Sequence, residues 1–349
     1  MINAYGNYVG FGNTKQLQIT GNHESFVQNG FQVIKFYYLS GSAVSGNGTG
    51  SFILPETKEV EYLVIGGGGS SGLPRTITLD NNKLTPCGGG GAGTLMTGSF
   101  LGLKGMQYNT IVGEGGQKEL GTPPNYATSD SGSNGAISSL VGTSGFGALS
   151  IIAPGGGCGG STTETGLNVG EENGRTGGSG GGGGVSINTA GPFATIAQSG
   201  SASSGSATGT ISFSSLQNQG GISEDSGAGA NDQVYFGAGG GATQAGGNGS
   251  FASQVGGNGG SGSFNAMSGS GRFFAGGGAG GYARVTGQGN WGLQGVGGGG
   301  GATGSGACCD LGYVNGPGQE QTGGGGAGGY SGGSGVIIVR YRIDQQNLA

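Results

Sequence analysis

The stretch Glu61-Tyr62-Leu63-Val64-Ile65-Gly66-Gly67-Gly68-Gly69 joins the two kinds of structure that this chain combines. Its first part is rich in the β-branched and aromatic residues that favour strands, and its second part is a run of four glycines. The reverse junction occurs near the end of the chain, where Gly335 is followed by Val336-Ile337-Ile338-Val339-Arg340-Tyr341-Arg342. Both junctions predict strands that run directly into glycine-rich segments. We expect Tyr62–Ile65 and Val336–Tyr341 to lie in the same β-sandwich, because both have the apolar density of buried strands.

Glycine supplies 96 of the 349 residues, against a usual share of about 7%. Each glycine in a regular element costs roughly 0.5–1 kcal/mol of backbone entropy relative to alanine. Such a chain is therefore either disordered or adopts a fold that only glycine fits. Charged residues make up only 8% of the chain, which argues against charge-driven disorder, and the 32% of apolar residues allows a modest core. The composition favours an ordered glycine lattice attached to a small hydrophobic domain.

The charge balance excludes some classes of partner. The formal net charge is −5 and no basic stripe is present, so nucleic acid is not expected as a partner. No apolar run approaches the roughly 18 residues of a membrane span, so no membrane insertion is expected. The first residues lack the charged and apolar regions of a signal peptide, and we expect export by lysis or by a dedicated route.

Further strands are expected at Glu24–Gln28, Phe31–Leu39, Met106–Val112 and Leu149–Ala153. Asn29-Gly30 separates the first two, and this dipeptide is the strongest short hairpin signal. Pro154 ends the last one because proline cannot continue a central ladder. No window shows sustained helical periodicity, so the chain is predicted to be all-β.

The glycine runs lie between these strands. They are Gly66–Gly69, Gly88–Gly91, Gly155–Gly157, Gly180–Gly184, Gly239–Gly241, Gly276–Gly278, Gly297–Gly301 and Gly323–Gly326. Their spacing does not match the every-third-residue repeat of collagen, and the aromatic residues between them are unlike a flexible linker. Extended left-handed helices of the polyproline II type can hydrogen-bond to one another where no side chain intervenes. We therefore expect a bundle of about eight polyglycine II helices, inserted in the β-sandwich.

Several blocks resemble the glycine-rich domains of phage and viral structural proteins. They are Glu61–Gly69, Gly88–Thr94, Tyr108–Gly116, Gly323–Gly329 and Gly335–Tyr341. The layout is also similar to that of the glycine-rich domain of the anaplastic lymphoma kinase family, although this chain has no kinase. The resemblance implies a jelly-roll-like sandwich whose strands flank a polyglycine bundle. In phage tail adhesins of this kind, loops on the bundle choose the host receptor.

The expected organisation has three parts. Residues 1–50 are predicted to be an N-terminal β docking segment, and residues 51–343 a glycine-rich domain. Within that domain the helix bundle covers about residues 66–335, and residues 344–349 form a tail.

No catalytic or cofactor-binding constellation stands out, so we expect neither an enzyme nor a cofactor. His23 is the single histidine, and a solvated turn residue is the simpler interpretation. The acidic pairs Glu171-Glu172 and Glu224-Asp225 can bind calcium, but such pairs are more often solvated. The four cysteines match no metal-binding spacing and leave three alternatives: packed small hydrophobes, a sparse disulfide or a metal site. They are Cys87, Cys158, Cys308 and Cys309.

Aromatic residues beside the glycine runs are the best binding candidates. They are Tyr235, Phe236, Arg272, Phe273, Phe274 and Trp291. In one interpretation these side chains cover the outside of the glycine bundle. In the other, some lie exposed at loop tips and bind a host glycan or an outer-membrane protein.

The resemblance, taken together with these observations, implies a virion structural protein on the particle surface, of the tail fibre, adhesin or spike type. Its expected partners are other virion proteins and a host receptor, and it can form a homo-oligomer. The alternative is a microbial extracellular sheath or filament protein, or a capsid decoration protein, with no receptor-binding role.

Overall fold

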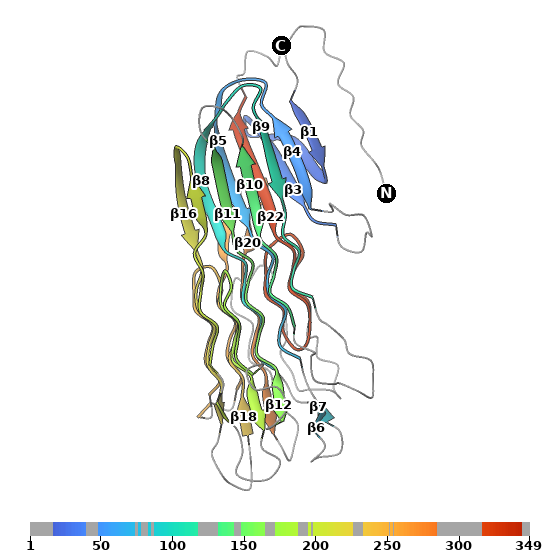
Figure 1. The fold of residues 1–349 in the computed structure, drawn as a ribbon, viewed down its shortest axis with the longest axis vertical. Coiled ribbons are helices and arrows are strands. Elements are labelled where there is room, and N and C mark those ends of the chain that lie inside the picture. The colour runs from blue at the N-terminus through green and yellow to red at the C-terminus, as the bar shows by residue number, and fades with distance from the viewer. Residues whose placement is uncertain are drawn as a thin grey trace.

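The computed structural model describes residues 17–39, 48–73, 76–77, 83–84, 87–117, 132–142, 148–164, 172–187, 195–196, 198–225, 233–250, 252–253, 255–284 and 316–343. Regular structure in this part of the chain is entirely β, with no helix, which confirms the all-β prediction. The molecule is elongated (Figure 1). Two large sheets lie at one end, glycine-rich segments run along the long axis, and short strands such as β12 and β18 lie at the far end.

Each of the two large sheets has six antiparallel strands. Sheet I has the order β1-β4-β9-β10-β11-β15, with bounds Gln18–Gly21, Thr49–Ile53, Gln107–Ile111, Ser138–Gly142, Leu149–Ala153 and Ser206–Thr208. Sheet II has the order β16-β8-β5-β22-β3-β2, with bounds Ile211–Leu216, Leu95–Gly102, Lys58–Ile65, Val336–Arg342, Phe31–Tyr37 and His23–Gln28.

The two sheets share one hydrophobic core, to which their inward-facing side chains contribute. Aromatic rings connect them: Phe52 of sheet I stacks on Tyr108 at 4.9 Å, and Phe100 of sheet II lies 5.3 Å from the same tyrosine. Alternation along the strands produces this arrangement, since Tyr108 and Thr110 point inward while their neighbours are exposed. Each large apolar side chain buried in this way stabilises the fold by roughly 1.5–3 kcal/mol.

The two segments that were expected to belong to the same β structure lie in one sheet. Strand β22 lies directly beside β5, with Val336 opposite Ile65 and Tyr341 opposite Val60. The predicted hairpin is also present, because β2 pairs with β3 through Asn29 and Gly30, whose φ angles are 51° and 79°. Strands β9 and β11 fall where they were expected.

Part of the predicted N-terminal docking segment is built into these sheets. Strand β1 pairs with β4 in sheet I, and β3 pairs with β22 in sheet II. Residues 18–37 therefore belong to the same β structure as the C-terminal strand.

The glycine-rich segments hydrogen-bond to one another with a period of three residues. In residues 66–72, every third N–H group donates to the same neighbouring segment. The three bonds to one neighbour are Gly66 to Thr94, Gly69 to Gly91 and Gly72 to Gly88. The N–H groups of Gly67 and Ser70 donate to residues 133–136, and those of Gly68 and Ser71 donate to residues 330–333. One extended segment thus donates to three different neighbours in rotation.

The next segment repeats the pattern with its own three neighbours. Residues 88–94 donate to residues 154–160 and 323–326 in the antiparallel sense, and to residues 237–240 in the parallel sense. The predicted hydrogen bonds between glycine runs are therefore present.

Close backbone approach explains why glycine is required. A Cβ atom on Gly68 would overlap the carbonyl oxygen of Gly324, and one on Gly239 would overlap that of Gly90. Small side chains are nevertheless accommodated at other positions of the same segments, which are Ser70, Ser71, Ala92, Ser179 and Ala238. Segments without a glycine run, such as residues 113–116 and 132–136, also take part, so the number of runs does not give the number of segments.

Four smaller sheets complete the fold. Two of them have three strands: β12 (Thr162–Glu164), β13 (Val185–Ile187) and β14 (Thr195–Ile196) form one, and β17 (Glu224–Asp225), β18 (Gln233–Tyr235) and β21 (Tyr282–Arg284) form the other. The remaining two have two strands each: β6 (Thr76–Ile77) pairs with β7 (Lys83–Leu84), and β19 (Ser263–Asn265) pairs with β20 (Arg272–Phe274). The β19–β20 hairpin covers part of the outer face of sheet II, where Phe274 and Met267 pack with Val33, Leu63 and Ile338.

Candidate functional site

Two predicted binding residues lie at the far end of the molecule but are buried. Tyr235 ends β18, and Phe236 donates its N–H to the carbonyl oxygen of Gly281. Both side chains have 0% of their surface exposed. These two rings are therefore not among the exposed ones of the binding interpretation, and their burial agrees with the interpretation in which they cover the glycine bundle.

Arg272 and Phe274 have structural contacts in the β19–β20 hairpin. The Arg272 guanidinium lies 4.9 Å from the centre of the Phe274 ring and donates to the carbonyl oxygens of Glu320 and Gln321. Partial burial lowers the pKa of Arg272 below its usual range. Phe274 is 1% exposed, so it is not one of the exposed rings of the binding interpretation. The two hydrogen bonds fasten the hairpin to Glu320 and Gln321.

Phe273 is different, because it is 43% exposed and points away from sheet II. Its ring meets that of Phe264 edge to face, at 5.4 Å and 70°. Phe264 stands opposite Phe273 in the hairpin and is 60% exposed. Sequence analysis did not select Phe264. Its position between Ser263 and Asn265 in a short polar strand is the signal that would have identified it.

The predicted binding residues do not form one site. Tyr235 and Phe236 lie near the far end, with β18, whereas β20 lies beside the large sheets (Figure 1). Trp291 lies outside the described residues. Among the predicted residues that the structure describes, Phe273 is the exposed aromatic one, and we call it and the opposite Phe264 the aromatic pair.

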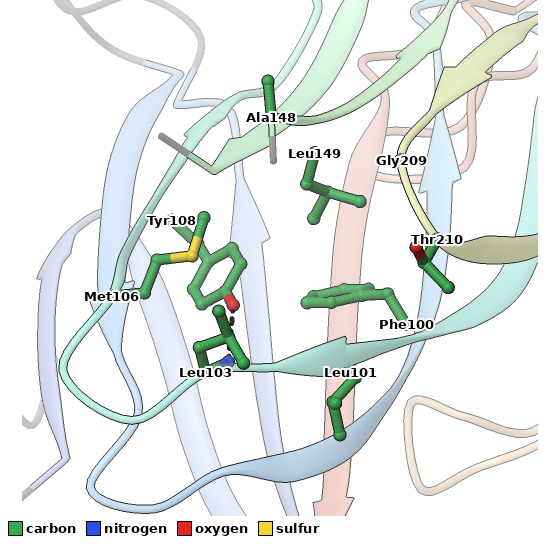
Figure 2. Close-up of a pocket in the computed structure, with 9 residues that line it drawn as sticks. All are labelled: Phe100, Leu101, Leu103, Met106, Tyr108, Ala148, Leu149, Gly209 and Thr210. Carbon is green, nitrogen blue, oxygen red and sulfur yellow. Dashed lines mark hydrogen bonds between the residues drawn. The ribbon is translucent and has the colours of Figure 1, made fainter. Parts of the chain in front are cut away.

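A hollow of about 590 Å³ opens at the end of the large sheets that faces away from the glycine segments. Figure 2 shows its lining, which is mostly apolar: Phe100, Leu101, Leu103, Met106, Tyr108, Ala148, Leu149, Gly209 and Thr210. The Tyr108 hydroxyl accepts a 2.8 Å hydrogen bond from the Leu103 N–H group. Burial raises the pKa of Tyr108, and that hydrogen bond opposes the rise. The lining residues offer apolar contact, without an acid, a base or a strong nucleophile.

Metal-binding and nucleophilic groups are not gathered in the part of the chain that the structure describes. No three of the His, Cys, Asp and Glu residues there lie close enough to hold a metal ion. Cys87 and Cys158 are buried. Burial raises the pKa of the Cys158 thiol to about 11, although the Ser70 hydroxyl and the charge of Arg175 lower it. These two cysteines fit the small-hydrophobe alternative, and Cys308 and Cys309 lie outside the described residues.

His23 is placed in strand β2, where its Nδ1 lies 2.9 Å from the carbonyl oxygen of Gly21. Among the described residues, no helix has the length and apolar character that crossing a membrane requires.

A family model described as a glycine-rich domain matches residues 43–342, which is most of the chain. None of the curated proteins matches the sequence significantly.

Proposed function

The chain belongs to the glycine-rich domain family, and we propose that it is a virion structural protein of the tail fibre or adhesin type. In this proposal the large sheets are a jelly-roll-like β-sandwich that anchors the chain, and the glycine segments are a rigid rod. Binding loops and the aromatic pair are carried on that frame.

The rod is a bundle of polyglycine II helices. The supporting observation is the period of three in the hydrogen bonds, since a polyproline II helix has three residues per turn and no internal hydrogen bonds. Successive N–H groups of such a helix point about one third of a turn apart and meet three neighbours in rotation. Residues 66–72 and 88–94 both donate in this way.

This bundle is the observation that carries the functional proposal. Loops that bind partners are most effective when a rigid scaffold fixes them. Strands β5 and β22 continue directly into the glycine segments, so the sandwich and the rod are one covalent frame without a hinge linker. Such a frame suits a protein that must keep a contact surface in a fixed position on a particle.

The aromatic pair is the contact surface that we assign to a host glycan or protein receptor. Exposed aromatic rings supply large apolar area at a small entropy cost, and interfaces use them as anchors. The Arg272 contacts hold the backbone of the hairpin beneath the pair.

The experiment is immunogold labelling with antibodies against the purified chain, applied to particles and cells from the source culture. Label at tail tips or spikes supports an attachment role. Uniform label over the capsid indicates a decoration protein, which is the alternative without receptor binding. Label confined to cell sheaths or filaments overturns the virion proposal.

A further inference from the structure

The strand residues on the outer face of sheet I are exposed or partly exposed, and none of them is charged. Side chains alternate along its strands, so the residues between the buried positions form the opposite face. Two rows across the sheet follow from the strand register. They are Thr49–Ile111–Ser139–Ile152–Ser206 and Thr20–Ser51–Asn109–Val141–Ser150–Thr208. We call this surface the sheet I face.

Charge is strongly segregated between the two sheets. No residue in the six strands of sheet I is charged. All charged residues of the two sheets belong to the strands of sheet II: Glu24, Lys35, Lys58, Glu59, Glu61, Arg340 and Arg342. Several of these are paired on the outer face of sheet II, such as Arg340 with Glu61 at 2.7 Å. The two sheets that enclose one core therefore differ in charge, although the same chain forms both.

Apolar side chains are spread among the hydroxyl and amide groups of the sheet I face. Ile111 is 51% exposed, and Ile137, which directly precedes β10, is 54% exposed. Val141 and Ile152 are partly exposed on neighbouring strands. Apolar groups mixed with uncharged polar groups and without charges resemble the core of a protein interface, which is depleted in charged residues.

We propose that the sheet I face packs against the same face of a second copy of this chain. A charged partner surface would lose its hydration here without gaining an opposite charge, which is costly. The partner face must therefore be uncharged too, and the sheet I face itself meets that requirement. Its serine, threonine and asparagine side chains both donate and accept hydrogen bonds, so the face is self-complementary.

The net charge of the chain also favours contact between two copies through the sheet I face. Each chain carries a formal charge of −5, so two copies repel wherever their acidic groups approach one another. Contact through the sheet I face brings no charged strand residue against its copy and leaves the ion pairs of sheet II in solvent. The resulting interface is isologous and closes as a dimer.

The test is the mass of the full-length chain in solution, measured by sedimentation at concentrations up to about 100 μM. Wild type is expected to be a dimer. Ile111→Lys and Asn109→Lys place an ammonium group at the centre of the face, and each should weaken dimerisation at least about 100-fold. Both residues are exposed in the single chain, so the melting temperature, extrapolated to low concentration, should change little.

Matched controls place the same charge on the other sheet. Leu101→Lys and Ser214→Lys change exposed residues on the outer face of sheet II, and both variants should remain dimers. A monomeric wild type would overturn the proposal. So would lysine variants of the sheet I face that remain dimers, or control variants that become monomers.

Discussion

Gly68 and Ala92 occupy similar places in the glycine segments but differ in the space around them. Both residues are buried, and both donate a backbone N–H hydrogen bond to a neighbouring segment. Residue 92 has room for a Cβ atom, whereas a Cβ atom on residue 68 would overlap a carbonyl oxygen. The sequence predicts the need for glycine in general, but it does not distinguish these positions. The distinction depends on which neighbouring segment lies opposite, and that is set by the tertiary arrangement.

Gly68→Ala is expected to destabilise the fold by at least about 2 kcal/mol, because the new methyl group forces two segments apart. The measurement is the free energy of unfolding in denaturant. Ala92→Gly is the matched control and should cost only about 0.5–1 kcal/mol. Equal effects of the two changes would contradict the packing argument. The same sensitivity is predicted for Gly299→Val, at a position outside the described residues.

Cys158 is expected to resist alkylation in the folded protein at about pH 8, because burial raises the pKa of its thiol to about 11. The thiol ionises at lower pH when unfolded, near its usual value of about 8.5. Its contribution to stability is therefore complete below that value and is lost as pH rises toward 11. Stability of the Cys158→Ala variant should fall less over this range. Rapid alkylation without unfolding would contradict the burial.

Strands were predictable where β-branched residues are dense, as in β3, β5 and β22. Strands β4, β8, β10 and β16 were missed because serine, threonine and glycine dilute their apolar residues. What makes them strands is pairing with distant neighbours: β8, for example, pairs with β5 on one side and with β16 on the other. Local propensity does not contain that information.

The sequence likewise did not indicate which phenylalanine of β20 is exposed. Phe273 and Phe274 are adjacent phenylalanines, and only the direction in which the strand lies on sheet II decides which ring is buried. The sequence therefore predicted one of the two residues of the proposed site, because Phe273 was selected and Phe264 was not. The other selected rings, Tyr235, Phe236 and Phe274, are buried.

Phe264→Ala and Phe273→Ala should weaken attachment to host cells by about 2 kcal/mol or more, if the aromatic pair is the contact surface. Their cost in stability should stay near the 0.5–1.5 kcal/mol of an aromatic pair. Phe274→Ala is the contrast, since removing a buried ring should cost about 3–5 kcal/mol of folding stability. Binding of purified variants to host cells and denaturant unfolding measure the two effects. Unchanged binding by both exposed variants would move the receptor contact elsewhere.

At the scale of the whole molecule, the sheets and the glycine segments depend on one another. The core strands hold the ends of the segments in register, as where Gly66 donates to Thr94 beside the paired residues Ile65 and Leu95. In return, the segments connect strands that are far apart in sequence. The order of strands and glycine runs predicted this coupling, but the neighbour of each segment could not be derived, because glycine runs carry no side chains that specify a partner.

Amide hydrogen exchange tests the proposed bundle directly. Amides of residues 66–72 and 88–94 lie in neither helix nor sheet, yet each donates to a fixed carbonyl oxygen. They should therefore exchange slowly, with protection that approaches the global free energy of unfolding. Segments that are only flexible spacers would exchange at random-coil rates whatever the stability of the sheets. If these amides and the amides of β5 and β22 lose their protection at the same denaturant concentration, the rod and the sandwich unfold as one unit. A rigid attachment device requires this behaviour.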